Sequence, residues 1–366
     1  MYIRTLIYYF FYNQCVRILS GLIPFKSYRK RFREAFFKET PPYFVRHSLY
    51  GKIYMPHYEL AFPIIYQEPE IYNAQGEKMR TFFVRSYLDA HYPNSDSKYF
   101  LWDRFNIALP VHFYKEKAIL ETMKNNGGGA KYAYFSESES IIPKDYEIFQ
   151  THKGIHKDFQ AVFTFSEKLL HTLENAKFIP ATGFWYGQER GCDIQLDEKV
   201  YQIKDKNISM VCSHKILCQM HKIRHSIAQK ALDSKKVDIF GKFNGGKYLP
   251  HKADSLQKYR FQIVIENDIT AYYFTEKILD CFVAQCIPIY LGASKIDQFF
   301  NSDGIITFTP DTPLEEIFKM CNEKEYLNRL EAVLDNYHRA LPYKNVNDML
   351  YEEYFTDKPK RFTGVR

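Results

Sequence analysis

Short apolar runs alternate with stretches of helical periodicity along most of the chain after about residue 45. Apolar runs of this length that end in polar loops are typical of buried strands. Strands that alternate with helices predict a parallel sheet with helices on both faces. In the N-terminal half we expect strands at 81–88, 131–138 and 161–166, and helices at 112–123 and 167–175, the first ended by Gly127-Gly128-Gly129.

A second set of the same kind begins near residue 207. Two such sets, joined near 190–206, predict an α/β protein with two Rossmann-like domains facing a cleft. The expected strands are 207–213, 236–241, 259–267, 287–292 and 304–308, and the expected helices are 217–232 and 275–286. We therefore expect an N-terminal domain at 41–200, a C-terminal domain at 201–312 and a helical tail at 313–366.

The first 40 residues differ from the rest in pattern and charge. The apolar stretch 5–23 approaches the length of a membrane span, but Asn13, Gln14 and Arg17 interrupt it at a depth where an Arg is costly. Eight basic and two acidic residues lie in 1–40, so the remainder carries only about +1 of the net charge of +7. Aromatic residues beside Lys and Arg predict a basic amphipathic helix that lies on an anionic membrane through residues 1–38. An ordinary buried helix is the alternative.

The composition narrows the class of protein. The chain has 366 residues, 46% hydrophobic and 17% aromatic, which suits two folded domains. Seven cysteines without a CxxC pair indicate reduced thiols and a cytoplasmic setting. With nearly all the net charge in one terminal segment, we expect no nucleic-acid partner. No GxGxxG, GKS/T or GxSxG pattern occurs, which removes the main support for dinucleotide, P-loop and α/β-hydrolase readings.

The strongest chemical pattern lies at 265–277, where a buried strand ends in a polar loop and a helix opens at Thr275. Ligands bind at the carboxyl ends of strands in such sheets, and helix N-termini favour phosphate. Lys277 adds a cation, and Glu266 and Glu276 can accept hydrogen bonds from sugar hydroxyls. A capped helix with a surface Lys–Glu pair is the alternative interpretation.

The stretch 259–293, YRFQIVIENDITAYYFTEKILDCFVAQCIPIYLGA, resembles the signature of the α-1,3-fucosyltransferase family, glycosyltransferase family 10. The resemblance implies the GT-B fold and GDP-fucose as donor substrate. It also implies that Lys277 contacts the donor diphosphate. The other implied donor-binding residues are Tyr273 and Glu276 at the ribose and nucleotide, Asn267 and Glu266 near the sugar, Arg224 on the preceding helix, and Gly245 and Gly246 in a turn near the nucleotide. For the two glycines, a plain turn remains the alternative.

The same resemblance places a catalytic base at Glu137. Ser136 and Ser138 replace the Gly and Asn of the family's Thr-Gly-Glu-Asn motif, and Glu139 is a second candidate. A base that accepts the proton of an acceptor hydroxyl implies inversion at the donor's anomeric carbon. Arg224, Lys277 and a helix N-terminus can stabilise the leaving diphosphate. Because the chain has no Asp-x-Asp motif, we expect neither a metal nor a cofactor.

Three further patterns point elsewhere. His214, Cys218, His221 and His225 share one helical face and form a weak candidate zinc site. Aromatic side chains stack on sugars, so Trp102-Asp103-Arg104 and Trp185-Tyr186-Gly187 are candidate acceptor subsites, with core positions as the alternative. The segment 23–33, IPFKSYRKRFR, resembles the N-terminal part of bacterial enzymes that build capsule and lipopolysaccharide.

The resulting hypothesis is a fucosyltransferase at the inner face of the cytoplasmic membrane. It would transfer fucose to a glycan or lipid-linked acceptor during surface polysaccharide synthesis. One alternative keeps the fold and mechanism but uses another nucleotide sugar. The other alternative is a catalytically silent glycan-binding protein.

Overall fold

A computed structural model describes residues 2–24, 28–29, 32, 45–46, 53–54, 71–73, 76–86, 97–104, 109–124, 129–189, 191–358, 360–362 and 365. The chain forms two compact units, one of Met1–Glu68 with Asp103–Ala108 and one of Pro69–Trp102 with Leu109–Arg366. In the first unit, helix α1 covers Tyr2–Gly21, and β1 (Val45–Arg46) pairs with β2 (Ile53–Tyr54). Most of the basic cluster at 26–33 lies outside the described residues. Among the helices that are described, none is long and apolar enough to cross a bilayer.

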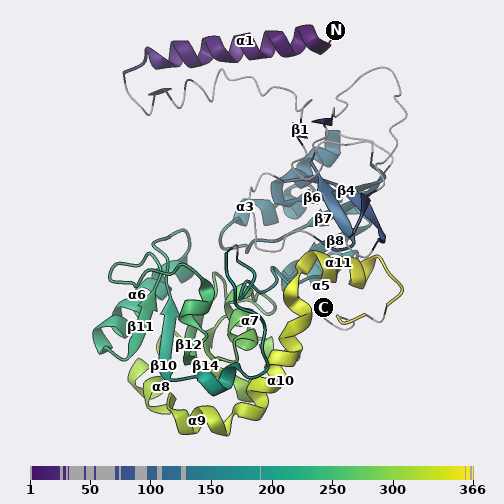
Figure 1. Cartoon of the computed structure of the whole chain (residues 1–366). Helices are drawn as coiled ribbons and strands as arrows, with labels where there is room; N and C mark the ends of the chain where they lie inside the picture. Colours follow the sequence, from purple (N-terminus) through teal and green to yellow (C-terminus); the bar gives the residue numbers. More distant parts are fainter. Residues whose placement is uncertain are drawn as a thin grey trace. The chain divides into compact units, whose positions relative to one another are not determined.

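The second unit contains two sheets, and the first of them is mainly parallel (Figure 1). Its strand order is β3-β4-β6-β7-β8-β9, with β3 antiparallel to β4 and with β5 paired to β4 outside this path. Successive residues of the inner strands are buried, such as Phe82 and Phe83 of β4 and Phe113 and Tyr114 of β6, so both faces of these strands are covered, as expected of a parallel sheet. The strands are β3 (Ile71–Tyr72), β4 (Lys78–Arg85), β5 (Phe100–Asp103), β6 (Val111–Lys115), β7 (Ala130–Tyr134), β8 (Ala161–Thr164) and β9 (Ala176–Phe178).

The helix expected at 112–123 is wrong in its first third. Residues Val111–Lys115 form strand β6 between β4 and β7, and only Glu116–Lys124 is helical, as the 3₁₀ helix η1. His112, Phe113 and Tyr114 are all buried, so this strand has no alternation of apolar and polar positions to distinguish it from a helix. The expected end at Gly127-Gly128 lies outside the described residues.

The second sheet is entirely parallel, with the order β11-β10-β12-β13-β14. From β10 the chain first adds β11 on one side of β10 and then adds β12 on the other side. The direction in which strands are added therefore reverses between β10 and β12. In doubly wound sheets, ligands bind at this switch point, outside the carboxyl ends of the strands. The strands are β10 (Lys206–Val211), β11 (Val237–Phe240), β12 (Tyr259–Ile265), β13 (Ile287–Leu291) and β14 (Ile306–Thr307).

Helices surround the sheets and complete the fold (Figure 1). The longest in the second unit, α6, follows β10, and α7 follows β12 after a ten-residue connection. The helices are α3 (Pro143–Tyr146), α4 (Ile148–Thr151), α5 (Glu167–Thr172), α6 (Gln219–Ser234), α7 (Glu276–Val283), α8 (Leu314–Met320), α9 (Glu323–Asn328), α10 (Leu330–Ala340) and α11 (Val346–Tyr354). Short 3₁₀ turns η2 (Ile155–Asp158), η3 (Val200–Ile203), η4 (Lys252–Ser255), η5 (Ile296–Gln298), η6 (Ser302–Gly304) and η7 (Leu341–Lys344) join them.

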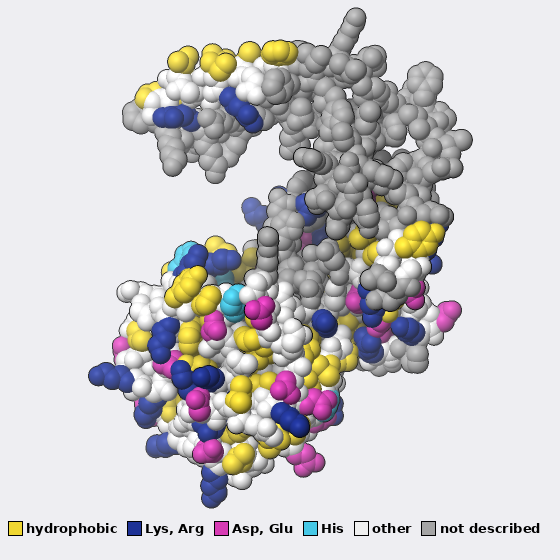
Figure 2. Space-filling model, in the orientation of Figure 1, with side chains coloured by type: hydrophobic (Ala, Val, Ile, Leu, Met, Phe, Trp, Pro, Cys, Tyr) yellow, Lys and Arg dark blue, Asp and Glu magenta, His cyan; other side chains and the backbone are white. Residues whose placement is uncertain are grey.

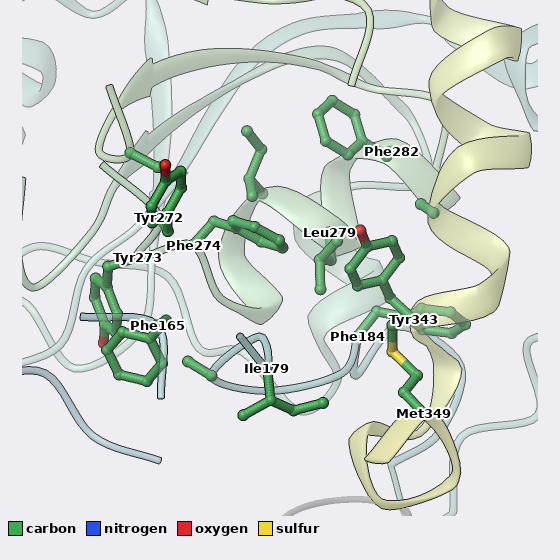
Figure 3. Packing of buried hydrophobic residues seen from close by; sticks show 14 of the residues in the cluster. Phe165, Ile179, Phe184, Tyr272, Tyr273, Phe274, Leu279, Phe282, Tyr343 and Met349 are labelled. Atoms are coloured by element: carbon green, nitrogen blue, oxygen red, sulfur yellow. The ribbon is translucent and has the colours of Figure 1, made fainter. Parts of the chain in front are cut away.

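One hydrophobic cluster connects the two sheets. It contains Phe163 from β8, Phe274 from the loop before α7 and Met349 from α11, and Figure 3 shows part of it. The last helix packs on the first sheet, where the Phe355 ring lies 5.4 Å from the Phe82 ring. Phe282 of α7 and Phe300 pack against each other at 4.5 Å within the same cluster. Because side chains from both sheets pack in this shared core, the loops at the facing ends of the sheets are held in fixed positions relative to each other.

The α/β class and the arrangement in two mainly parallel sheets, both expected from the sequence, are therefore confirmed. The domain limits stay predictions, since the two sheets belong to one compact unit. Basic and acidic side chains are interspersed over the face of this unit drawn in Figure 2, with no continuous basic patch on that face.

Candidate functional site

A cavity of about 580 Å³ lies at the switch point of the second sheet, within the size range of small-molecule sites. Loops after β10 and β12 form one wall, and the loop after β7 of the first sheet forms the other. Its lining includes four cationic side chains, which give the cavity a charge suited to an anionic ligand. The polar and charged lining residues are Ser136, Glu137, Thr182, Ser213, Lys215, His221, Arg224, Lys252, Gln262, Asn267, Tyr273, Thr275, Glu276 and Lys277.

Glu266 is fully buried at the end of β12 and holds the loop that follows. Its Oε1 accepts the Thr275 N–H at 3.0 Å, and its Oε2 accepts the Thr275 hydroxyl at 2.8 Å and the Lys277 ammonium at 3.2 Å. Gly292 leaves room for this carboxylate, because a Cβ there would lie 2.7 Å from Glu266 Cγ. Glu266 is not among the cavity-lining residues. Its position is better suited to orienting Lys277 than to contacting a sugar. The contact between Glu266 and the donor sugar stays a prediction.

Arg224 and Asn267 meet in the lining of the cavity. The guanidinium of Arg224 is 6% exposed and donates from Nε to the Ile265 carbonyl at 3.1 Å and from Nη2 to Asn267 Oδ1 at 2.9 Å. Nη2 also donates to the Ile265 carbonyl. The recorded bonds thus fix the planar fork through two of its three nitrogens, and the side chain lines the cavity.

His221, one turn before Arg224 on α6, completes this group. Its Nδ1 accepts the Leu217 N–H at 2.9 Å, so the ring proton lies on Nε2, which donates to Asn267 Oδ1 at 3.1 Å. Burial lowers the pKa of His221, and the adjacent Arg224 lowers it further. Both effects keep the imidazole neutral. With both ring nitrogens engaged, His221 is not arranged as a metal ligand.

The start of α7 brings Glu276 and Lys277 to the cavity. Thr275 caps the helix, its hydroxyl accepting the Lys277 N–H, and Thr182 accepts the Glu276 N–H at 2.9 Å. Glu276 is buried and lies 3.4 Å from the Lys277 ammonium. Burial by itself would raise the pKa of Glu276, but Lys277 and Lys252 lower it, so the carboxylate stays charged. In this pair Glu276 is buried and Lys277 half-buried, so it is not the surface pair of the alternative interpretation.

Lys252 and Asp280 form a second buried ion pair beside the first, with Nζ 3.0 Å from Oδ2. Burial would lower the pKa of Lys252, but Asp280 and Glu276 raise it well above its ordinary value. Asp280 Oδ1 also accepts the N–H groups of Trp185 and Tyr186, at 2.6 and 2.8 Å. This pair therefore holds Trp185 and Lys252 in the cavity wall. Sequence reasoning missed it, although Asp280 in the apolar run of α7 was a visible signal.

Glu137 faces the same cavity from the end of β7. Its Oε1 accepts the Ser138 N–H at 2.8 Å and the Tyr273 hydroxyl at 3.3 Å. Tyr273 is anchored by its ring, which lies 5.0 Å from the Phe165 ring, and burial raises its pKa well above the ordinary value, so it stays a hydrogen-bond donor. Two donors on one oxygen orient the carboxylate and leave Oε2 as its more accessible acceptor.

The structure separates the remaining candidates. Glu139 does not line the cavity and lies 3.9 Å from Lys168, so geometry favours Glu137. Gly245 and Gly246 also lie outside the lining. A Cβ on Gly246 would lie 2.7 Å from the Gly241 carbonyl, which supports the plain-turn alternative and leaves a donor role a prediction.

The aromatic and histidine candidates also divide. Trp185 lines the cavity, whereas Tyr186 is buried and Trp102 packs edge-on against Phe113 at 5.0 Å. His225 Nε2 donates to the Ser213 carbonyl at 2.7 Å. His214 and Cys218 precede α6, so the four candidate zinc ligands do not share one helical face, and among the described residues they form no metal-binding group.

Comparison with known proteins finds a family model that matches the region of the second sheet. Residues 201–345 match the model of glycosyltransferase family 10 (fucosyltransferase), C-terminal part, which confirms the resemblance seen in the sequence. Over 61 residues the chain is 33% identical to the α-(1,3)-fucosyltransferase FucT of Helicobacter pylori, a match that covers 17% of this chain and 13% of that protein.

Solved structures give weaker likenesses. A crystal structure of an α1,3-fucosyltransferase has a TM-score of 0.48 at 15% identity, covering 76% of this chain and 92% of its own. A structure of an α1,3-fucosyltransferase with GDP-fucose has a TM-score of 0.45 at 15% identity, covering 77% and 92%. The structure of TarM has a TM-score of 0.41 at 9% identity, covering 65% and 53%.

Proposed function

We propose that this chain, whose residues 201–345 match glycosyltransferase family 10, transfers fucose from GDP-fucose to a glycan hydroxyl. The observation that carries the proposal is the group of charges fixed by internal contacts at the start of α7 and on α6. Arg224, Glu276 and Lys277 are held by internal hydrogen bonds in the cavity wall at the switch point of this matched region. A diphosphate is the ligand that such a fixed cationic group at a helix N-terminus suits best.

In the proposed reaction, Glu137 accepts the proton of the acceptor hydroxyl. The oxygen of that hydroxyl attacks the anomeric carbon of the donor at the same time. Attack from the face opposite the leaving group inverts the configuration at that carbon. Arg224 and Lys277 stabilise the charge that develops on the departing diphosphate. We expect this stabilisation to suffice without a divalent metal, because cationic side chains take the place that a metal fills in other transferases.

The acceptor in this proposal is a glycan or lipid-linked sugar of a surface polysaccharide, such as capsule or lipopolysaccharide. Trp185 supports a sugar-binding role for the cavity, since its ring is in the wall where a sugar face can stack on it. The basic residues within 1–38 support attachment to an anionic membrane, and the proposed location of the enzyme is the inner face of the cytoplasmic membrane.

The test is a transfer assay with the full chain, fucosylated product being detected by mass spectrometry. GDP-fucose should be consumed in the presence of EDTA, and the new linkage should have the anomeric configuration opposite to that of the donor. Consumption of a uridine or cytidine sugar instead would support the alternative, a glycosyltransferase that uses a different donor. No consumption of any nucleotide sugar, with no nucleotide binding, would favour a silent glycan-binding protein.

A further inference from the structure

Two tight turns shape the loop that carries Trp185. The Gln188 N–H donates to the Trp185 carbonyl at 2.9 Å, and the Cys192 N–H donates to the Glu189 carbonyl at 3.0 Å. Each turn has a glycine at its third position, Gly187 with φ 71° and Gly191 with φ 78°. A left-handed conformation at that position is typical of type II turns and favours glycine. Glu189 and Cys192 are therefore the first and last residues of the second turn, which brings their side chains close together.

His251 joins these two residues from another part of the chain, immediately before η4. One potential ligand atom from each of Glu189, Cys192 and His251 lies within 4.8 Å of the other two. All three side chains are half-buried. The two segments are already in contact through the backbone, because the Lys252 N–H donates to Glu189 Oε2 at 2.7 Å.

The polar groups of this cluster are incompletely used among the described residues. The His251 side chain caps η4 through the Asp254 backbone N–H, yet its buried Nδ1 lacks a partner at ordinary hydrogen-bond geometry among those residues. Because buried polar atoms normally have partners, an imidazole nitrogen with only this capping contact, beside a thiol and a carboxylate, has capacity left for a ligand.

We propose that Glu189, Cys192 and His251 bind a single Zn²⁺ ion. Thiolate, imidazole and carboxylate are the three ligand types of protein zinc sites, and a soft thiolate disfavours magnesium or calcium. Around a tetrahedral zinc, ligand atoms are separated by roughly 3.5 Å, so the three groups need to close by about 1 Å. Water would complete the coordination. None of the three residues lines the large cavity, so this ion is distinct from any metal on the donor diphosphate.

The zinc would fasten two parts of the cavity wall together. Trp185 precedes the ligand turn, and Lys252 follows His251 directly; both line the cavity. The Asp280 carboxylate already joins them, because it accepts from the Trp185 N–H and the Lys252 ammonium. A metal bound between the same two segments would restrict their separation further, and so keep Trp185 at its place in the wall.

The experiment uses the full chain freed of metal by a chelator that is then removed. Zn²⁺ is titrated against a chromophoric chelator, and Co²⁺ is added to a separate sample to reveal thiolate ligation by its charge-transfer absorption. We expect one tightly bound zinc per chain, a thiolate-to-cobalt band, and a higher unfolding temperature with zinc than without. Cys192→Ala and His251→Ala should each weaken zinc binding by at least about tenfold and Cys192→Ala should abolish the band.

Matched variants separate the site from general effects. Glu189→Gln retains an oxygen for the Lys252 N–H but should bind zinc more weakly, and Cys15→Ala removes an exposed cysteine and should change nothing. If circular dichroism showed that the wild-type chain is folded and the titration found no bound zinc, the proposal would be overturned. A cobalt band that persists in Cys192→Ala would also overturn it. GDP binding measured on the same samples tests the proposed function separately, since we expect it to survive in Cys192→Ala.

Discussion

The cavity wall formed by the segments after β10 and β12, called the β12 wall below, differs from the wall that follows β7 in how its charged groups are held. On the β12 side, Glu266, Glu276 and Arg224 are buried and every one is fixed by two or more hydrogen bonds or ion pairs. On the β7 side, Glu137 is half-buried and only one of its oxygens has recorded partners, Ser138 and Tyr273.

This difference suits two kinds of work. A fixed arrangement of charges costs no reorganisation when a ligand of constant shape binds, as the diphosphate of a nucleotide sugar would. A carboxylate with an accessible oxygen can receive a proton, and its partners orient it without consuming that oxygen. Under the proposed function, the β12 wall holds the donor and the β7 wall acts on the acceptor. The following predictions use variants on each wall to test whether the two walls have these different roles.

The largest effect is expected at Glu137. Glu137→Gln keeps an oxygen for the Ser138 and Tyr273 donors but cannot take up a proton, so the transfer rate should fall by about 10²–10⁴-fold. GDP affinity should change by less than about twofold, because the change is on the acceptor wall. Transfer is measured by product mass spectrometry and affinity by calorimetry. Glu139→Gln is the control and should transfer normally; if it were the variant that lost transfer, the base assignment would be wrong.

The next effect is expected at Arg224. Arg224→Lys keeps the charge but loses the planar fork that binds Ile265 and Asn267, so GDP affinity should fall by roughly tenfold to a hundredfold. Calorimetric titration with GDP measures this. Lys222→Ala changes an exposed cation on the same helix and should leave the affinity unaltered. Equal losses in both variants would show that a diffuse positive charge, rather than the fixed fork, attracts the nucleotide.

A smaller effect on stability is expected at Gly292. Gly292→Ala places a Cβ against Glu266 and the Tyr290 ring, and the displaced carboxylate should lower the free energy of unfolding by about 1–3 kcal/mol. Denaturant unfolding measures the loss, and GDP binding should weaken with it because Glu266 positions Lys277. Gly21→Ala, where a Cβ meets nothing within 4 Å, is the comparison. Unchanged stability in Gly292→Ala would mean that Glu266 is not held as tightly as described.

The smallest effect concerns pH. Because the pKa of His221 lies below its ordinary value of 6.5, the unfolded chain binds a proton that the folded chain does not as the pH falls through 6.5. The free energy of unfolding should therefore be highest above this pH and decrease below it. His221→Gln can still donate to Asn267 but does not titrate, so it should make this decrease shallower. A steeper decrease in the variant would contradict a neutral His221.

Much of the β12 wall was predictable because its signals are local. The strand, the cap at Thr275 and the adjacent Glu276 and Lys277 follow one another in sequence, so spacing alone brought them together. Glu137 was found through the resemblance, and its contact with Tyr273 joins residues 136 positions apart. Lys252 and Asp280 were missed because their partnership depends on how η4 packs against α7, which no local pattern encodes. The zinc ligands were missed for the same reason, since His251 lies far from Glu189 and Cys192 in sequence.

The most direct test of the central claim is calorimetric titration of the purified chain with GDP, UDP and CMP in the presence of EDTA. The account predicts that GDP binds selectively, that the chelator does not abolish this binding, and that Arg224→Lys weakens it. Absence of binding by all three nucleotides, or binding that disappears on chelation, would contradict the assignment of the buried charges on α6 and α7 to a metal-free diphosphate site.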